Sequence, residues 1–432
     1  MRNFTLVWLA YLISSIGNRI GDFAITLWVW ELTGSATSLA LTGFFYQLPR
    51  IVTSIFAGIV VDHFSRKYLM ILSEAAVVAS TLMLLMLYLR GQLVIWHLYL
   101  AVSINGGFEK FGQLAYRASI SLLVDNQNYT RANSMNAAIA NSSSIIAPAI
   151  AGILYPIIGL GGILPIKLVL IAIALSILAL LEIPQPTVEQ KKYKEKKISL
   201  VNRLTSFWLE VTFGIRYLWQ SPNLKALLII TTLFWLPYTL MDTVYQPLVL
   251  ARTNSSSQAL GAVSTISGFA GITGAIALTV WGGFRNNVRG MLTGFTSASL
   301  AEIVFGLGQG LSVWLPAQFC ASLSYSLIES SETALWMKAT PAKVQGRVFA
   351  AHFLVYDLLS MPVILLAGVL SDRVFEPAMR SPSILQYLFA PIFGTTSGAG
   401  IAVLYILSTI GMLLAGILGF KMSQLYRIEE IK

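Results

Sequence analysis

The stretch GIVVDHFSRKYLM, residues 58–70, places an acidic residue, a histidine and two basic residues between two long apolar runs. The 432-residue chain around it is 56% hydrophobic and only 11% charged, and its mean hydropathy is +0.72. Typical globular domains carry about 25% charged residues. A bilayer core requires roughly 20 apolar residues per helical crossing, and runs of that length recur along nearly the whole chain. The composition therefore predicts an all-α, multi-pass membrane protein whose helices are joined by short polar loops.

The apolar runs predict twelve membrane-spanning helices. They cover residues 5–30, 37–61, 67–90, 94–119, 134–157, 162–183, 224–250, 258–282, 290–309, 313–338, 348–371 and 400–422. The first run is expected to be a retained helix, because no small-residue cleavage site follows a short apolar core. Cytoplasmic segments collect Lys and Arg, and about 21 of the 29 basic residues share a side with the N-terminus. Both termini are therefore predicted to be cytoplasmic, in the inner or plasma membrane, and the net charge of +10 reflects topology and not nucleic-acid binding.

A basic segment at residues 184–222 predicts a cytoplasmic linker between two six-helix halves, residues 1–183 and 223–432. The second part of the linker has apolar residues at alternating spacings of three and four, which predict an amphipathic helix on the cytoplasmic membrane face. These residues are Val201, Leu204, Trp208, Val211, Ile215 and Leu218. A calmodulin-type binding helix is the alternative for this pattern.

Matching signals recur about 216 residues apart, as an internal duplication requires. Arg131 of TRANS and Arg347 of GRVFA are 216 residues apart, and Pro148 and Pro362 are 214 apart. The opening stretch has a weaker counterpart in GGFRNNVRGML near Phe284. The repeats predict two pseudo-symmetric six-helix halves, an architecture typical of secondary transporters.

The segment GIVVDHFSRK resembles the loop signature of the major facilitator superfamily, which lies between helices two and three. The segments TGSATSLALTGFFYQLPR, SLLVDNQNYTRANSMN, GIRYLWQSPNLKALL, QGRVF and SDRVFEP resemble its drug:proton antiporter branch, which includes macrolide and enterobactin exporters. The resemblance covers almost the whole chain and implies a central cavity lined by helices one, four, seven and ten. Two positions depart from the pattern. Phe284 replaces the Asp of the C-terminal loop signature, and Ala147 replaces the Gly before Pro148 in the antiporter signature.

The loop after the second helix is a predicted cytoplasmic gate formed by Gly58, Asp62, Arg66 and Lys67. Gly58 permits close helix approach, and Asp62 and Arg66 are expected to form a charge-assisted contact that breaks when the cavity opens inward. The alternative for the two basic residues is that they only anchor the topology.

Seven ionisable residues fall on predicted helices one, four, seven and ten. They are Arg19, Asp22, Glu109, Lys110, Asp242, Glu329 and Glu332. Each costs about 2.5–3.5 kcal/mol at a helix centre. Facing lipid, the set would cost on the order of 20 kcal/mol, more than a typical fold's net stability. They are therefore predicted to pair or to face a water-filled cavity, as proton-coupling or substrate-binding residues.

Several of these residues have alternative roles. Arg19 and Asp22 are three residues apart on one helix face and could satisfy each other. Glu329 and Glu332 also share a face, and two close carboxylates favour a shared proton, unless Arg or Lys from another helix pairs with them. Asp242 lies among aromatic residues and could contact substrate.

Residues His352 and Asp357 on the eleventh helix are secondary coupling candidates, with helix packing as the alternative for the histidine. Glu74 and Glu302 fall on helices expected to be peripheral and are interpreted as structural. The cavity set holds five acids and two bases. An acidic, aromatic-rich cavity favours a lipophilic cation.

The energy source is predicted to be an ion gradient. No G-x-x-x-x-G-K-[ST] motif is present, since GFEKFGQL has Gln113 where Lys is required. Three histidines and one cysteine, Cys320, form no nucleophile or metal-binding pattern and no internal disulfide. We therefore expect no enzyme activity, metal, cofactor, nucleotide or nucleic-acid partner.

The predicted function is proton-coupled export of a hydrophobic small molecule, such as a drug, a macrolide or a siderophore-like compound, by alternating access of a monomer. One proton crossing 100 mV provides about 2.3 kcal/mol. The alternatives are an importer or lysophospholipid flippase on the same fold, and a non-transporting membrane receptor or assembly partner.

Overall fold

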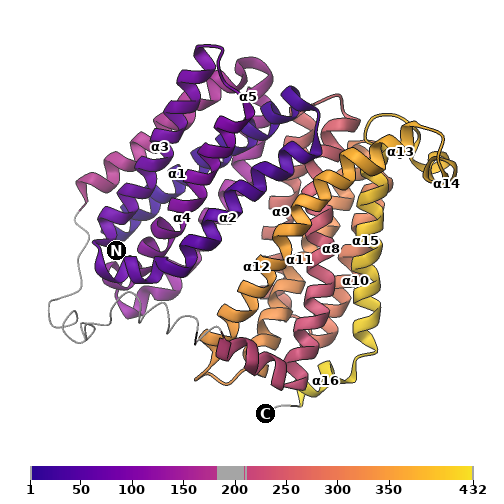
Figure 1. Cartoon of the computed structure of the whole chain (residues 1–432). Coiled ribbons are helices and arrows are strands. Elements are labelled where there is room, and N and C mark those ends of the chain that lie inside the picture. Colours follow the sequence, from indigo (N-terminus) through magenta and orange to yellow (C-terminus); the bar gives the residue numbers. More distant parts are fainter. Residues whose placement is uncertain (1, 182–208, 210–211, 431–432) are drawn as a thin grey trace. The chain divides into compact units, whose positions relative to one another are not determined.

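The computed structural model describes residues 2–181, 209 and 212–430, and every regular element within them is a helix (Figure 1). Most of the predicted amphipathic linker helix, including Val201, Leu204, Trp208 and Val211, lies outside the described residues. Residues 212–220 are helical, and within them Leu218 is buried while Ile215 is exposed.

The described helices match the twelve predicted crossings to within a few residues at most ends. They are α1 (Arg2–Thr33), α2 (Ala36–His63), α3 (Arg66–Leu89), α4 (Ile95–Leu123), the two arms of α5 (Tyr129–Leu180), α8 (Pro222–Arg252), α9 (Ser257–Trp281), α10 (Asn287–Leu307), α11 (Leu311–Ala339), α12 (Gln345–Leu370) and α15 (Ala399–Phe420). Length and apolar composition alone identify eight spans among the described residues, one of them the 50-residue stretch Arg131–Leu180.

Helix α5 is 52 residues long, well beyond the roughly 20 residues that one crossing needs. Its backbone breaks at Gly159, which has φ 61° and ψ −170°, a conformation that glycine adopts without steric cost. The break falls between the predicted fifth and sixth helices. The α5 helix therefore supplies two crossings joined by a single non-helical residue.

The chain folds as two compact units. The first comprises residues 1–34, 41–198 and 260–265, and the second comprises residues 35–40, 199–259 and 266–432. Within the first unit, α1 packs along α5, and α3 packs against both α4 and α5. Its core includes the buried residues Val7, Leu69, Met70, Ala115 and Leu178.

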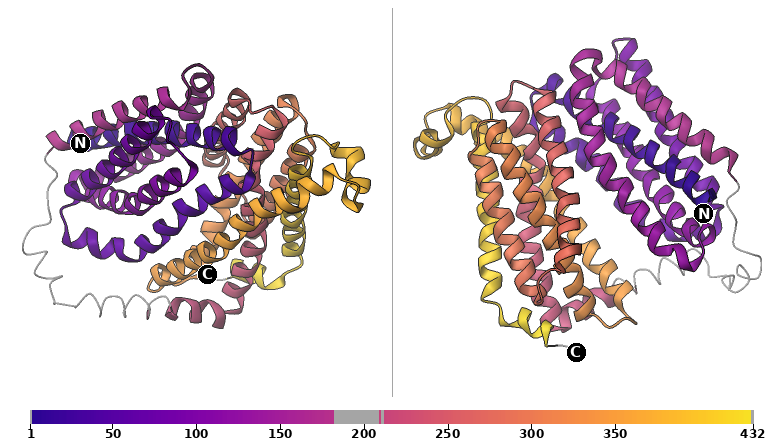
Figure 2. Two further views of the ribbon diagram at one scale, coloured as in Figure 1. Left: turned by 45° about the horizontal axis from the view of Figure 1, so that its top comes forward. Right: turned by 180° about the vertical axis from the view of Figure 1, so that it is seen from behind.

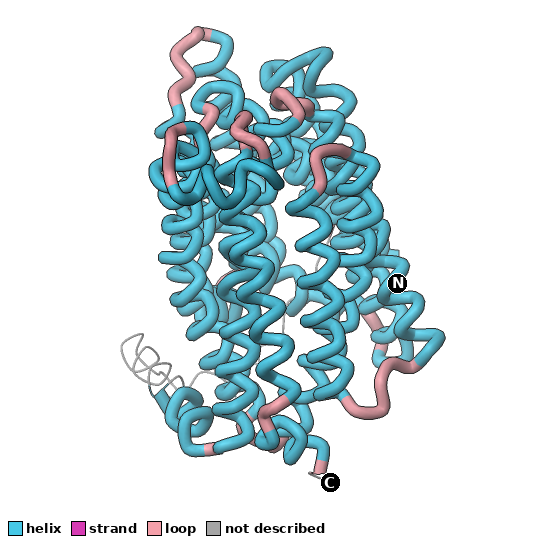
Figure 3. The backbone as a smooth tube through the Cα atoms, turned by 90° about the vertical axis from the view of Figure 1, so that its right-hand side faces the viewer, coloured by secondary structure: helices cyan, strands magenta, loops and turns pink. Residues whose placement is uncertain are grey.

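In the second unit, α10 packs along α11 and α15, and α8 packs against α12 and α15 (Figure 2). Phe234 of α8 and Phe295 of α10 stack in its core with ring centroids 3.8 Å apart. Short loops join most helices (Figure 3). These five long helices therefore turn faces toward the interior of the unit.

The segment between α12 and α15 is largely helical. It contains the π-helical turn η2 (Ser371–Phe375) and the short helices α13 (Glu376–Arg380) and α14 (Ile384–Phe393). Glu376 accepts hydrogen bonds from the backbone N–H groups of Gly398 and Gly400, at 2.8 and 3.0 Å, and so caps the start of α15. The apolar α14 has only 10 residues, too few to cross a bilayer, which is why it was not among the predicted spans. A further short helix, α16 (Ser423–Glu429), follows α15.

Candidate functional site

The predicted gate residues Arg66 and Lys67 begin α3 and bind backbone carbonyls. The Arg66 guanidinium donates to Ala118 O at 2.6 Å, and the Lys67 ammonium donates to Ala179 O at 2.7 Å. Both acceptors lie near the C-terminal ends of helices, where basic groups are favourable. The side chains at positions 58 and 62 fall outside what the structure describes, so the Asp62–Arg66 contact stays a prediction.

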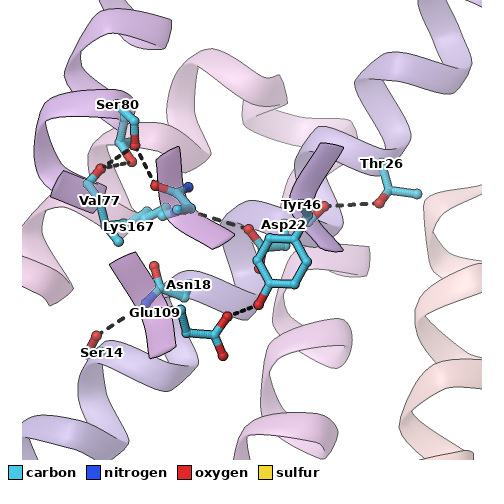
Figure 4. Close-up of polar contacts among 11 residues, drawn as sticks. Ser14, Asn18, Asp22, Thr26, Tyr46, Val77, Ser80, Glu109 and Lys167 are labelled. Carbon is cyan, nitrogen blue, oxygen red and sulfur yellow. Dashed lines mark hydrogen bonds and ion pairs between the residues drawn. The ribbon is translucent and has the colours of Figure 1, made fainter. Parts of the chain in front are cut away.

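In the first unit, Asp22 of α1 faces Lys167 from the second arm of α5 (Figure 4). Asp22 Oδ1 lies 3.7 Å from Lys167 Nζ, and the two side chains are 61% and 1% exposed. The space for the lysine comes from Gly21, because a Cβ there would lie 2.4 Å from Lys167 Cδ. Arg19 is exposed and, among the described residues, does not form an ion pair with Asp22. The cation that pairs with Asp22 is therefore Lys167.

Residues Glu109 and Lys110 of α4 are both half-buried. The Tyr46 hydroxyl of α2 donates a hydrogen bond to Glu109 (Figure 4), and Lys110 Nζ donates to Gln113 at 3.3 Å. Helices α2 and α4 approach closely here. Gly106 permits this approach, because a Cβ at that position would collide with the Tyr46 carbonyl oxygen. The two predicted cavity residues thus lie beside each other in sequence but contact different groups.

Residue Glu74 of α3 is buried against α1. Ser14 Oγ lies 2.7 and 2.8 Å from its two carboxyl oxygens, and Asn18 Nδ2 donates to Ser14 Oγ at 3.3 Å. Glu74, Ser14 and Asn18 thus form one polar cluster, and Asp22 and Lys167 form an ion pair further along α1. Sequence reasoning missed Lys167, although a lone lysine inside the apolar run 162–183 was an available signal.

In the second unit, Glu332 of α11 is buried and accepts two indole N–H groups. Trp235 Nε1 lies at 2.9 Å and Trp336 Nε1 at 3.3 Å. Within the described residues Glu332 has no Arg or Lys partner, which was the alternative for it. Glu329, one turn earlier, is exposed. The two glutamates therefore share a helix but occupy different environments.

The secondary candidate His352 of α12 lies over the Trp336 ring, with centroids 4.2 Å apart. His352 is therefore connected to Glu332 through Trp336, which donates a hydrogen bond to that carboxylate. Asp357 is half-buried on the same helix, beside Tyr356, whose hydroxyl lies 3.0 Å from Thr239 Oγ1.

Aromatic rings connect the acidic residues of the second unit. Tyr238 packs edge-on against Trp235 and Tyr325, at centroid distances of 5.0 and 5.1 Å. Asp242 follows one turn after Tyr238 on α8 and is exposed. Such rings bind organic cations through their faces, and carboxylates nearby add to the attraction.

The buried acid of α10, Glu302, is the residue that sequence reasoning undervalued. It is 2% exposed and accepts hydrogen bonds from the hydroxyls of Tyr325, at 3.0 Å, and Tyr405. Because Tyr325 also packs on Tyr238, Glu302 joins the same aromatic cluster. Its burial depends on how α10, α11 and α15 pack, which periodicity along one helix does not reveal.

The arrangement suits binding of protons and cations. Among the described residues no group of three or more His, Cys, Asp or Glu side chains could hold a metal ion. The free cysteine, Cys320, is exposed on α11. What the two units offer chemically is carboxyl groups inside membrane-length helices, with hydroxyl, indole and aromatic neighbours.

Comparison with known proteins identifies the family. The model of the Major Facilitator Superfamily matches residues 7–363. Macrolide efflux protein A of Streptococcus pyogenes is 24% identical over 375 residues, covering 86% of this chain and 90% of that protein. Multidrug efflux pump Tap of Mycolicibacterium fortuitum is 23% identical over 372 residues, covering 85% and 86%.

Solved structures share the fold. The nucleoside transporter NupG aligns with a TM-score of 0.71 at 12% identity, over 98% of this chain and all of that one. A bacterial homologue of the iron transporter ferroportin, in its inward-facing state, aligns with a TM-score of 0.68 at 14% identity, over 97% and 98%. The predicted resemblance is confirmed, and this chain is a multi-pass membrane transporter, not an enzyme, that belongs to the major facilitator superfamily.

Proposed function

We propose that this transporter exports a hydrophobic, positively charged small molecule in exchange for protons, by alternating access. One observation carries the proposal: carboxyl groups on membrane-spanning helices lack close cationic partners. Within the described residues Glu302 contacts only tyrosine hydroxyls, and Glu332 contacts only indole N–H groups. Asp22 is largely exposed and is held by a single cation at 3.7 Å.

An unpaired negative charge inside the bilayer costs several kcal/mol. A bound proton removes that charge, and a bound organic cation compensates it. A site of this kind therefore alternates between two occupants of the same charge, which is the chemical requirement for exchange of a cation against a proton.

The aromatic neighbours support a hydrophobic cargo. Trp235, Tyr238 and Tyr325 form a contiguous ring cluster beside both buried acids of the second unit. Two relatives, a macrolide efflux protein and a multidrug efflux pump, favour export over import. Macrolides and other amphiphilic cations are accordingly the first compounds to test.

The orientation is part of the proposal: both termini cytoplasmic, in the plasma membrane, with the chain acting as a monomer. It is testable because Cys320 is the only cysteine. In a Cys320→Ser background, a new cysteine at Ser423 in α16 should react with a membrane-impermeant maleimide only after whole cells are permeabilised. Labelling of intact cells would show that the C-terminus faces outward and would contradict the proposed orientation.

The decisive experiment is transport in proteoliposomes loaded with a pH-sensitive dye. Purified protein is given tetraphenylphosphonium, a macrolide or a siderophore under an imposed pH gradient, and both cargo flux and proton flux are measured. We expect coupled fluxes of opposite direction for the cationic compounds, lost in Glu302→Gln and Asp22→Asn.

The matched control is Glu31→Gln on α1, a carboxylate outside both clusters that accepts from the Tyr155 hydroxyl at 2.6 Å. It should transport like the wild type. Cargo flux that does not depend on the pH gradient would contradict proton coupling. Cargo that moves in the same direction as protons would favour the importer. Binding without flux, unchanged in all three variants, would favour the receptor.

A further inference from the structure

The basic residues inside the membrane-length helices are distributed unevenly between the two units. In the second unit, the inner parts of the long helices contain no Lys or Arg; these are residues 226–251, 258–281, 290–307, 311–337, 348–370 and 399–420. The basic residues away from helix ends all belong to the first unit: Arg19, Arg50, Lys110, Arg117 and Lys167. The first unit is therefore where an anionic group finds a positive counter-charge inside the membrane.

Among these basic residues, Arg50 of α2 has a buried donor that no described group accepts. Its Nη1 donates to Gln47 Oε1 at 3.3 Å, and the guanidinium lies 6.0 Å from the centroid of the Tyr46 ring. Within the described residues neither Nε, which is buried, nor Nη2 has a hydrogen-bond partner. Nε and Nη2 together form the edge of a guanidinium that binds a carboxylate or phosphate through two parallel hydrogen bonds. That edge of Arg50 is not satisfied by the described part of the protein.

The depth of Arg50 makes an unsatisfied charge costly. Helix α2 runs from Ala36 to His63, so Arg50 lies about 20 Å along the axis from either end. Basic side chains near helix ends extend to the membrane surface, whereas a charge near the centre needs a partner or water and marks a functional site. None of the ion pairs in the described residues includes Arg50. A counter-charge from outside the protein would fill that role.

The backbone around Arg50 is fixed against α4. Pro49 has no N–H group, so the carbonyl of Phe45, four residues earlier, loses its helical donor. Ser103 Oγ of α4 donates to that carbonyl instead, at 2.9 Å. Gly106 of α4 provides the space for this close approach. Arg50 is thus held by a braced helix, as a binding residue requires.

The acid connected to this group is Glu109 of α4, the alternative partner for Arg50. Tyr46 lies between the two in the chain of contacts: its ring lies under the guanidinium, and its hydroxyl donates to Glu109. No ion pair joins Glu109 to Arg50 in the described part of the chain. The tyrosine hydroxyl therefore stabilises Glu109, and the Nε–Nη2 edge of Arg50 is left for another oxyanion.

We propose that Arg50 is an oxyanion-binding residue, and that the cargo carries a carboxylate or phosphate group in addition to its cationic group. This inference rests on the proposed function and narrows its substrate class to zwitterionic amphiphiles. The oxyanion accepts hydrogen bonds from Nε and Nη2 of Arg50, and the carboxyl groups of the helices remain for the cationic group. The Tyr46 ring gives the adjoining apolar part of the cargo a surface to pack on.

Two pairs of ligands test the assignment, because the members of each pair differ by one anionic group. Ciprofloxacin and its methyl ester differ by a carboxylate, and dodecylphosphocholine and dodecyltrimethylammonium differ by a phosphate. Dissociation constants are measured by calorimetry on the purified full-length protein in a non-ionic detergent. We expect the wild type to bind the anionic member of at least one pair about tenfold to a hundredfold more tightly than its partner. Preference in the first pair alone identifies a carboxylate compound as the source of the oxyanion, and preference in the second pair alone identifies a lipid headgroup.

Three variants assign that preference to a residue. Arg50→Gln should bind both members of a pair equally well. Arg50→Lys keeps the charge but not the two-donor edge, so it should lose most of the preference. Arg90→Gln, at an exposed arginine that ends α3, should match the wild type. Tetraphenylphosphonium, which has no anionic group, should bind every variant and so verifies that each is folded.

Two results overturn the assignment while the proposed function stands. They are a wild type that binds the cationic compounds but shows no preference for the anionic member of either pair, and a preference that persists in Arg50→Gln. If only the anionic members bind, and only when Arg50 is present, the Arg50 assignment holds and the proposed cationic cargo is wrong. If no compound binds the wild type, both proposals fail.

Discussion

Glu74 in the first unit and Glu302 in the second are both buried acids on helices expected to be peripheral, yet their neighbours differ. Glu74 has one hydroxyl partner, Ser14 of α1. Glu302 has two tyrosine hydroxyls, Tyr325 and Tyr405, set in an aromatic shell. The first environment depends on a single hydroxyl donor. The second is held by rigid rings, so we expect Glu302 to keep a fixed position in the binding surface where the proposed exchange takes place.

The largest expected effect is removal of the space that admits Lys167. In Gly21→Val the new side chain meets Lys167, whose Cδ lies 2.4 Å from the position of a Cβ. Overpacking of this kind costs about 1–3 kcal/mol, and displacement of a buried cation adds to it. We expect a lower melting temperature in detergent and loss of transport.

Gly43→Val on α2 is the control for that substitution, because no heavy atom lies within 4 Å of a Cβ there. It should keep both stability and transport. If the two glycine variants behaved alike, the packing of Lys167 against α1 would not matter.

Removal of a tyrosine donor tests the rigid environment of Glu302. Tyr405→Phe leaves one carboxyl oxygen without its described donor, which should cost about 1–3 kcal/mol in the free energy of unfolding. Chemical denaturation in mixed micelles measures the loss. Tyr387→Phe, at an 85% exposed tyrosine, should have no effect. An equal loss of stability in that variant would mean that the assay, and not the missing hydrogen bond, causes the result.

Removal of the serine donor tests the environment of Glu74. Ser14→Ala should cost about 1 kcal/mol in the free energy of unfolding, because the carboxyl group loses its hydroxyl donor. A double-mutant cycle with Lys167→Met measures whether Lys167 is coupled to Ser14 through Glu74. Additive losses from the two variants would mean that Lys167 and Ser14 do not share Glu74.

The smallest effect should come from an exposed acid. Glu329→Gln should change the free energy of unfolding by less than about 0.5 kcal/mol, whereas Glu332→Gln, at a carboxylate that binds two indoles, should be clearly destabilising. A large effect at position 329 would place that residue in a pair within the native state.

Much of the fold was predictable, because the bilayer imposes a length on every apolar run. Twelve runs became twelve helical spans, and the break between the fifth and sixth coincides with Gly159. The short helices near residues 376–393 were not predicted, since no membrane constraint governs them. The other features of the architecture were predicted from the resemblance to the sequence signatures of the family.

The site was predictable only in part. Asp22, Glu109 and Glu332 were identified because a charge inside an apolar helix is costly wherever it lies. Their partners were not, because Tyr46, Lys167 and Trp235 come from other helices and the rotation of one helix against another is a property of packing. Burial of Glu74 and Glu302 follows from that same packing.

The fit between Gly21 and Lys167 also constrains evolution. The lysine is accommodated only while position 21 lacks a side chain, so the two positions are expected to change together across the family. Lineages with a short residue at 167 should tolerate alanine or larger at 21, and those with lysine should keep glycine. A substitution at either site alone is expected to be destabilising, which makes the pair a marker for transporters that keep a buried cation beside Asp22.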